Sequence, residues 1–192
     1  RSDGRDPTLP FMPRDPGQTD RLIRRLRWDE LDPAWLRRLA EMARAEDIAG
    51  GGLLHPPARC GDPSAALLVA SGRRAHARLV SRGEYVLAGL GLLEPILSVY
   101  GASCHVRPLV ADGTVISRGT VVAELEGPAT ELLTAERTLL NFLQRLTGVA
   151  TQTQTYVRAL GSSSARLLDT RKTTPGFRML EKYAVGQGGG YN

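Results

Sequence analysis

Residues 169–174, with the sequence DTRKTT, concentrate side chains that bind anions. Arg171 offers a planar guanidinium fork, which suits a carboxylate or a phosphate, and Lys172 adds a compact positive charge beside it. The two threonines that follow add hydroxyl donors. The proline after Thr174 predicts a helix start, whose backbone N–H groups favour an anion. We interpret this run as a site for a strongly anionic ligand; the alternative is a solvated loop with a helix cap.

The distribution of charge points to the same part of the chain. Residues 1–136 hold 17 basic and 18 acidic side chains, whereas residues 137–192 hold 8 basic and 2 acidic ones. The excess of positive charge that gives the chain its net charge of +5 therefore lies in residues 137–192. Nucleic acid is one candidate partner, and a phosphorylated sugar or a dicarboxylate is another. Only Lys172 and Lys182 are lysines, and both lie in this part. Either they mark a need for a compact ammonium group, or their position is chance.

Arg137 is a second candidate, because it lies in a leucine-rich helical run at 129–146. Leu133 precedes it by four residues and Leu140 follows it by three, so its base lies along the apolar stripe. A buried guanidinium needs a partner. That partner is either a nearby glutamate on the same helix or a carboxylate reached through a subunit contact.

The remaining chemical signals are weaker. The glycines at 188–190 permit close approach of a ligand to the backbone or form a flexible end. The three histidines show no metal-ligand spacing, so we predict no protein metal site. Cys60 and Cys104 predict two buried free thiols in a reducing, cytoplasmic compartment. No apolar run is long enough to span a membrane, so no membrane partner is expected.

The elements that must position these residues divide into an arm and two further parts. Prolines recur every third residue from 7 to 16, which predicts an extended or disordered arm at 1–18, or a ligand for an aromatic groove. Residues 19–127 predict an α+β domain. Its expected helices are 20–27 (capped by Asp20), a helix from Pro33 to the glycines at 50–52, and 90–100. Its expected strands are 65–70, 75–81, 85–88 and a meander of 105–110, 114–116 and 120–126.

Residues 128–192 predict the opening of a second architecture. The pattern favours a helix at 129–146, a break at Gly148, a second helix at 150–160, a buried strand at 165–168 and a helix from Thr174 to Val185. A single βα unit cannot close a barrel. The expected fold is therefore an N-terminal α+β domain followed by the start of an incomplete α/β (TIM-like) barrel, apparently truncated.

Two long stretches carry a resemblance to a known family. Residues 136–151 (ERTLLNFLQRLTGVAT) and 169–176 (DTRKTTPG), continuing through 180–185 to 188–192, resemble the motifs of quinolinate phosphoribosyltransferases, also called carboxylating nicotinate-nucleotide pyrophosphorylases. Glu46-Asp47 and residues 112–127 also fit the N-terminal domain of that family.

The resemblance implies a fold, a reaction and a set of site residues. The reaction joins quinolinate to phosphoribosyl pyrophosphate, with Mg²⁺, in a homodimer or higher oligomer with a shared active site. Arg137 would reach the site of a neighbouring subunit and hold quinolinate. Arg171 would bind a quinolinate carboxylate and Lys172 would serve the phosphoribosyl pyrophosphate side, both as catalytic residues. Thr170 would lie in the same wall.

The sequence also departs from the family, and other functions stay open. Members of the family carry a His-Arg pair directly after the position of Asn192 and further Lys, Glu and Asp residues later, so we expect this chain alone to be inactive. The alternatives are a related phosphoribosyltransferase with another acceptor, such as the molybdenum-transport-associated type, or a non-catalytic anion-binding fragment. A lipoyl-type carrier needs a lysine, and residues 1–171 contain none. A nucleic-acid module needs interleaved aromatics, which are missing.

Overall fold

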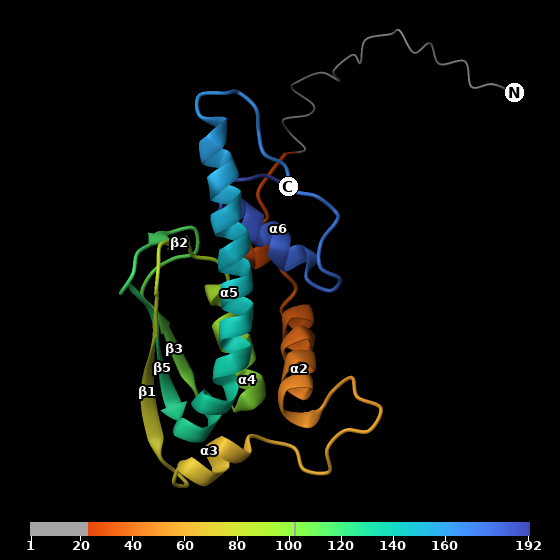
Figure 1. Cartoon of the computed structure of the whole chain (residues 1–192), viewed down its shortest axis with the longest axis vertical. Helices are drawn as coiled ribbons and strands as arrows, with labels where there is room; N and C mark the ends of the chain where they lie inside the picture. The colour runs from red at the N-terminus through yellow and green to blue at the C-terminus, as the bar shows by residue number, and fades with distance from the viewer. Residues whose placement is uncertain (1–22, 102) are drawn as a thin grey trace, which may run out of the picture.

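The computed structural model describes residues 23–101 and 103–192 (Figure 1). The expected arm at 1–18 and the cap at Asp20 lie outside these residues. Residues 23–27 are not helical, contrary to the expected short helix, and the 3-10 turn η1 (Trp28–Glu30) follows them.

Helix α2 (Pro33–Ala49) confirms the expected helix and both of its ends. The Asp32 carboxylate accepts a hydrogen bond from the Ala34 backbone N–H, and Pro33 occupies the first helical position. Gly50 closes the helix in the left-handed conformation, with φ of 66°. Leu36 and Leu39 are buried, whereas Met42 is 61% exposed.

Residues 63–68 form a helix, so the expected strand at 65–70 is wrong. Helix α3 (Pro63–Leu68) begins with Pro63 at its first position, and the Asp62 side chain accepts from the Ala65 N–H. This cap gives a free backbone N–H of the first turn a hydrogen-bond acceptor. The strand propensity of the apolar residues did not indicate a helix. Leu67 and Leu68 remain exposed.

The strands form two small antiparallel sheets rather than the expected meander. Strands β1 (Arg74–Val80), β5 (Val121–Pro128) and β3 (His105–Pro108) make one sheet in the order β1-β5-β3. Strand β4 (Val115–Ile116) is not part of this sheet and pairs with β2 (Tyr85–Val86) in the second sheet. The backbone at 87–90 causes this departure: Leu87 exchanges hydrogen bonds with Gly113 and Thr114, and the Asp112 carboxylate accepts from Gly89 and Leu90.

The core forms where the sheet, α2 and two further helices meet. The turn η2 (Leu90–Leu92) leads into α4 (Leu93–Tyr100), which confirms the expected helix at 90–100. Pro95 lies in its first turn, where its missing N–H costs no hydrogen bond. Leu92, Leu93, Ile96 and Leu97 are almost completely buried against α5 and its neighbours.

Helix α5 (Ala129–Leu160) is continuous for 32 residues, so the expected break at Gly148 is wrong. Leu146 and Ala150, on either side of the glycine, are both fully buried. Their packing outweighs the roughly 1 kcal/mol that a glycine costs inside a helix. Figure 1 shows the sheet along the first half of α5 and the last helix beside its second half.

After α5 the chain forms only the beginning of a parallel sheet. The expected buried strand at 165–168 is reduced to one parallel bridge between Leu168 and Tyr191, and Leu168 is 52% exposed. Helix α6 (Arg178–Gln187) begins four residues later than expected, because the Thr174 N–H is bonded to Glu181 instead of opening a helix. The fold is thus mixed α/β, as expected, and the barrel itself stays a prediction. So do the domain limits at 19–127 and 128–192, since β5 runs directly into α5.

Two further expectations concern single residues. Both cysteines are free, but Cys60 is exposed and Cys104 only partly buried, whereas two buried thiols were expected. Across the described residues, no helix combines the length and the apolarity that a membrane crossing requires.

Candidate active site

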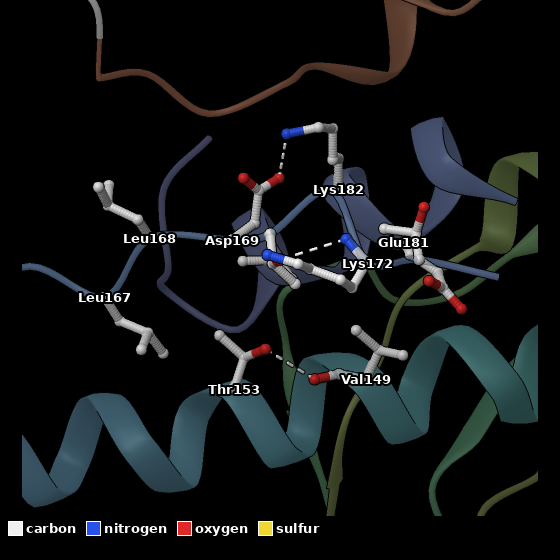
Figure 2. A pocket seen from close by; sticks show the side chains of 11 residues that line it. Val149, Thr153, Leu167, Leu168, Asp169, Lys172, Glu181 and Lys182 are labelled. Atoms are coloured by element: carbon white, nitrogen blue, oxygen red, sulfur yellow. Dashed lines mark hydrogen bonds and ion pairs between the residues drawn. The ribbon is translucent and has the colours of Figure 1, made fainter. Parts of the chain in front are cut away.

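A cavity of about 240 Å³ lies between the second half of α5, the segment 167–173 and helix α6 (Figure 2). Val149 and Thr153 of α5 form one wall, and Val185 of α6 adds to it. The polar wall comes from the segment expected to bind anions and from the first turns of α6. The cavity is therefore built where the excess positive charge of the sequence lies.

The structure brings two of the expected site residues to this cavity. Thr170 and Lys172 line it, and the Lys172 backbone N–H donates to Thr170 Oγ1 over 3.2 Å. Arg171 is exposed and does not line the cavity; its carbonyl oxygen accepts from Arg178 Nη2 over 3.4 Å. The guanidinium and the ammonium are thus not side by side in one pocket. Within residues 23–101 and 103–192, neither side chain has an ion-pair partner, so both charges are available to a ligand.

The expected helix start at Thr174 is wrong, so no helix N-terminus faces an anion there. The Thr174 N–H donates to Glu181 Oε2 over 3.1 Å, and its hydroxyl donates to Glu181 Oε1 over 2.8 Å. The anion site expected in this loop therefore has only its side chains as donors.

Both carboxylates that line the cavity are neutralised by cations. Lys182 forms an ion pair with Asp169, to which Asn192 Nδ2 also donates over 3.1 Å. Arg145 Nη2 lies 2.7 Å from Glu181 Oε1. Burial acts to raise the pKa of Glu181, but the hydrogen bonds from Arg145 and Thr174 outweigh it, and this pKa lies below its ordinary value. The Glu181 carboxylate therefore stays ionised.

The described residues do not fit a protein-held magnesium ion. Among them no group of three His, Cys, Asp or Glu side chains is placed to hold a metal, and Asp169 and Glu181 are engaged by cations. The requirement for Mg²⁺ stays a prediction.

Arg137 lies far from this cavity and pairs with a different helix. Its Nη1 is 2.6 Å from Asp47 Oδ1 on α2, so the alternative of an intrahelical glutamate is wrong. The Tyr100 hydroxyl donates to the same carboxylate over 3.2 Å. The Arg137 side chain is 71% exposed. It precedes Val149 by twelve residues, which is about 18 Å along the helix axis, so it does not reach the cavity of its own chain.

A larger groove of about 1140 Å³ runs between strand β1 and the first half of α5. Its lining includes Leu133 and Leu140 of α5 and Val80 and Tyr85 from the sheet region. Leu133, Val80 and Tyr85 are each more than 40% exposed. Sequence reasoning missed this groove, although Leu133 and Leu140 flank Arg137 on the helix and were both assigned to its apolar stripe.

Two of the glycines at 188–190 allow close packing against neighbouring helices. A Cβ at Gly188 would lie 2.3 Å from the Ala150 carbonyl oxygen, and one at Gly190 would lie 2.7 Å from Val185. The run therefore lets the chain pass close to α5 and α6. Sequence reasoning also assigned no role to Asp169, Arg145 or Glu181; the only signal for this group was the retained Lys182.

Two adjoining stretches of the chain match sequence profiles of one enzyme family. Residues 62–147 match the profile described as quinolinate phosphoribosyl transferase, N-terminal domain, and residues 149–192 match that of its C-terminal domain. The chain belongs to the quinolinate phosphoribosyltransferase family. The resemblance of its motifs is thereby confirmed.

Relatives in this family are moderately similar over the same region. The chain is 46% identical over 117 residues, 61% of its length, to a probable carboxylating nicotinate-nucleotide pyrophosphorylase of Bacillus subtilis, and spans 40% of that protein. It is 33% identical over 157 residues, 82% of its length, to a chloroplastic counterpart from Arabidopsis thaliana, and spans 42% of it.

Solved structures agree with this assignment. The crystal structure of NadC from Streptococcus pyogenes superposes with a TM-score of 0.76 at 35% identity, over 84% of this chain and 54% of that one. Human nicotinic acid phosphoribosyltransferase, at 15% identity and a TM-score of 0.51, shares the fold alone. The chain thus spans about half of the solved quinolinate phosphoribosyltransferase structures, and about two fifths of the curated relatives it matches.

Proposed function

We propose that this chain supplies part of the active site of an enzyme that joins quinolinate to phosphoribosyl pyrophosphate. The products are nicotinate mononucleotide, pyrophosphate and CO₂. The observation that carries the proposal is the state of charge around the cavity. Its two carboxylates, Asp169 and Glu181, are each matched by a cation, while Lys172 at the rim has no partner within the described residues. An anionic substrate therefore meets a net positive site.

The chemistry requires such a site. The pyridine nitrogen attacks the anomeric carbon of the ribose, and pyrophosphate leaves with the electron pair of the broken C–O bond. The carboxylate beside the ring nitrogen is then lost as CO₂, its electron pair stays on the ring carbon, and a proton takes its place. Charge develops on the leaving group, so fixed cations stabilise the transition state more than the ground state. Lys172 is suited to this role, with Thr170 beside it.

We further propose that the working site is shared between two copies of the chain. Arg137 lies about 18 Å along α5 from the cavity of its own chain, so it serves a substrate only at another subunit's site. The exposed apolar groove beside α5 supports this arrangement, because it offers a surface for a second copy. The Asp47 carboxylate holds the Arg137 guanidinium until that contact forms.

A direct test measures the binding of quinolinate and, separately, of phosphoribosyl pyrophosphate to the full-length protein by calorimetry. Replacement of a charge-assisted contact costs about 1.5–3 kcal/mol, so Arg171→Ala and Lys172→Ala should each weaken binding of their own substrate about tenfold to hundredfold. Arg118→Ala, an exposed arginine in the N-terminal part, is the matched control and should bind normally. Unchanged quinolinate affinity in Arg171→Ala would remove this residue from the site.

The shared site has its own test. Arg137→Ala and Lys172→Ala subunits are mixed, so that a hybrid dimer contains one intact site. Activity should return to about a quarter of the wild-type level, because half of a random mixture is hybrid and each hybrid has one working site of two. Mixtures that stay inactive would contradict the sharing.

A second candidate function is a related transferase whose acceptor carries a single carboxylate. The position of Arg171 outside the cavity lining favours it, since recognition of a second carboxylate then lacks an evident residue. Equal affinities for quinolinate and nicotinate would support this candidate, whereas a clear preference for quinolinate would support the first.

We infer a cytoplasmic location, on the ground that both cysteines are free thiols. The plant relatives are named chloroplastic or mitochondrial. Microscopy of the fluorescently tagged protein in its native host is therefore the direct check of its location.

A further inference from the structure

Asp169, the residue directly before the loop at 170–173, is held both through its backbone and through its side chain. The Asp169 N–H donates to the Tyr191 carbonyl oxygen over 2.8 Å, which holds the backbone. The Asp169 carboxylate pairs with Lys182, and Asn192 Nδ2 donates to the same oxygen. The two charged side chains are only 11% and 20% exposed, so their pairing is sheltered from water. Figure 2 shows Lys182 directed toward Asp169 at the edge of the cavity.

The same loop returns to a second fixed point. Thr174 gives both its N–H and its hydroxyl to the Glu181 carboxylate, and Arg145 Nη2 donates to the Thr174 hydroxyl over 3.0 Å. The Glu181 side chain is 9% exposed. The four residues between the two points have mostly exposed side chains.

Both fixed points are held by consecutive residues of α6. Successive helical side chains differ by about 100° in direction, so Glu181 and Lys182 leave the helix in different directions. Glu181 contacts Thr174 after the loop, and Lys182 contacts Asp169 before it. Arg178, the first residue of α6, donates to Thr173 Oγ1 over 3.2 Å and to the Arg171 carbonyl oxygen over 3.4 Å. One short helix thus contacts the beginning, the middle and the end of the loop.

We propose that Glu181 and Lys182 are positioning residues that form a clasp, holding the two ends of the loop so that Thr170 and Lys172 line the cavity. The clasp restricts the loop before any ligand arrives, and a restricted loop loses less entropy when it binds. The identity of the ligand rests on the proposed function, but the clasp itself does not.

Hydrogen exchange followed by mass spectrometry tests the clasp in this chain. Glu181→Gln replaces one accepting oxygen of the carboxylate by an amide donor, which then faces a donor of Thr174 or Arg145, and Lys182→Met removes the cation from Asp169. Exchange of the amides at 170–174 should become about tenfold faster in each variant, with α2 and the β1-β5-β3 sheet unchanged. Glu41→Gln, which breaks an exposed ion pair with Arg37, is the matched control and should leave the loop unaffected.

Two results would overturn the proposal. Exchange at 170–174 that is unchanged in both variants would show that the loop needs no clasp. Exchange that rises equally throughout the chain would show that the pairs serve general stability. Where Lys182→Met does not fold, the Glu181→Gln variant decides.

The consequence for binding is measured with inorganic pyrophosphate as the probe. The affinity of the chain for this anion should be lower in Glu181→Gln than in wild type. The control Glu41→Gln should keep the wild-type affinity and the wild-type melting temperature. Affinity that is unchanged in Glu181→Gln while its loop exchanges faster would contradict a positioning role. If the loop responds as expected but the full-length wild type binds no quinolinate, the proposed function fails and the clasp stands.

Discussion

Cys104 is a thiol whose surroundings suppress its reactivity. Its Sγ lies 3.6 Å from Glu131 Oε2, at the point where Gly127 of β5 passes. Burial, together with the negative charge of Glu131, raises the pKa of Cys104 to about 11. Cys60, by contrast, is exposed in the loop that follows α2.

We expect the two cysteines to differ sharply toward alkylating reagents. At pH 8 a thiol with a pKa of about 11 is only about one thousandth thiolate, which is the reactive form. Iodoacetamide should therefore modify Cys60 and spare Cys104 in the folded chain, as peptide mass spectrometry can check. Glu131→Gln should increase labelling of Cys104 because it removes the charge. Equal labelling of both thiols in the native protein would contradict the assigned environment.

Glu181 gives the clasp a dependence on pH. Its folded pKa lies below the ordinary value of 4.5, so its contribution to stability is present above pH 4.5 and is lost as the pH falls through the folded pKa. Loop exchange, corrected for its intrinsic pH dependence, should therefore rise as the pH is lowered from 5 toward 3. The Glu181→Gln variant should lack this rise, and a rise of the same size in it would assign the effect to other groups.

Single residues show what the sequence could and could not predict about the site. Lys172 and Thr170 line the cavity, in line with the residue types and neighbours that indicated an anion site, and their role in binding stays a prediction. The partner of Arg137 was missed because Asp47 is 90 residues away, and no helical spacing reveals such a pair. Lys182 was noticed only as a retained lysine, since its pairing with Asp169 depends on the path of the loop.

At the scale of elements, α5 shows how packing decides a local ambiguity. Gly148 lies inside the helix with no atom within 4 Å of the place where a Cβ would be. The glycine is therefore tolerated there, not required. The sequence pattern favoured a break, because it carries no information on what Leu146 and Ala150 pack against.

Gly148→Ala should stabilise the chain. Alanine loses less backbone entropy than glycine in a helix, which is worth about 0.5–1 kcal/mol, or roughly 1–4 °C in Tm for a chain of this size. Gly188→Ala is the matched control, because its Cβ would lie 2.3 Å from the Ala150 carbonyl oxygen and it should destabilise. Thermal unfolding followed by circular dichroism measures both. A lower Tm in Gly148→Ala would mean that the helix bends or is contacted at this position.

Helix α3 and strand β4 mark the limits of reading elements from propensity. Helix α2, with its Asp32 cap, and helix α4, with its run of apolar residues, were predicted closely. The apolar run at 65–70 suggested a strand, but Asp62 and Pro63 make it a helix. The pairing of β4 with β2 depends on Asp112, which contacts a backbone segment more than twenty residues earlier.

At the scale of the whole molecule, Asp112 joins the two matched parts of the chain. Its carboxylate accepts from the Gly89 and Leu90 N–H groups in the N-terminal part and from the Tyr183 hydroxyl of α6 over 2.8 Å. The Tyr183 ring, 5% exposed, also contacts the Trp28 ring edge-on at 5.1 Å between centroids. One carboxylate thus links segments that are 71 residues apart.

Burial dominates the ionisation of this link. It raises the pKa of Asp112 above the ordinary value of 3.8, and the three hydrogen bonds that oppose it do not offset it. Burial and the neighbouring carboxylate likewise raise the pKa of Tyr183, which stays a hydroxyl donor at neutral pH. Because the folded pKa of Asp112 is raised, its favourable contribution is complete below pH 3.8 and is lost as the pH rises through the folded pKa.

Asp112→Asn therefore tests how the two parts are held together. Asparagine does not ionise, so the free energy of unfolding of wild type, relative to this variant, should decrease as the pH rises from 4 to 7. Asp112→Ala should cost about 2–4 kcal/mol at pH 4, because it leaves two backbone donors and the Tyr183 hydroxyl without their acceptor, and this cost should shrink as the pH rises because alanine does not ionise either. Urea unfolding at pH 4, 5, 6 and 7 measures all three proteins. A wild type that instead gains on the asparagine variant with rising pH would mean that the hydrogen bonds, and not burial, govern this carboxylate, and that the ionised form is what holds α6 against the N-terminal part.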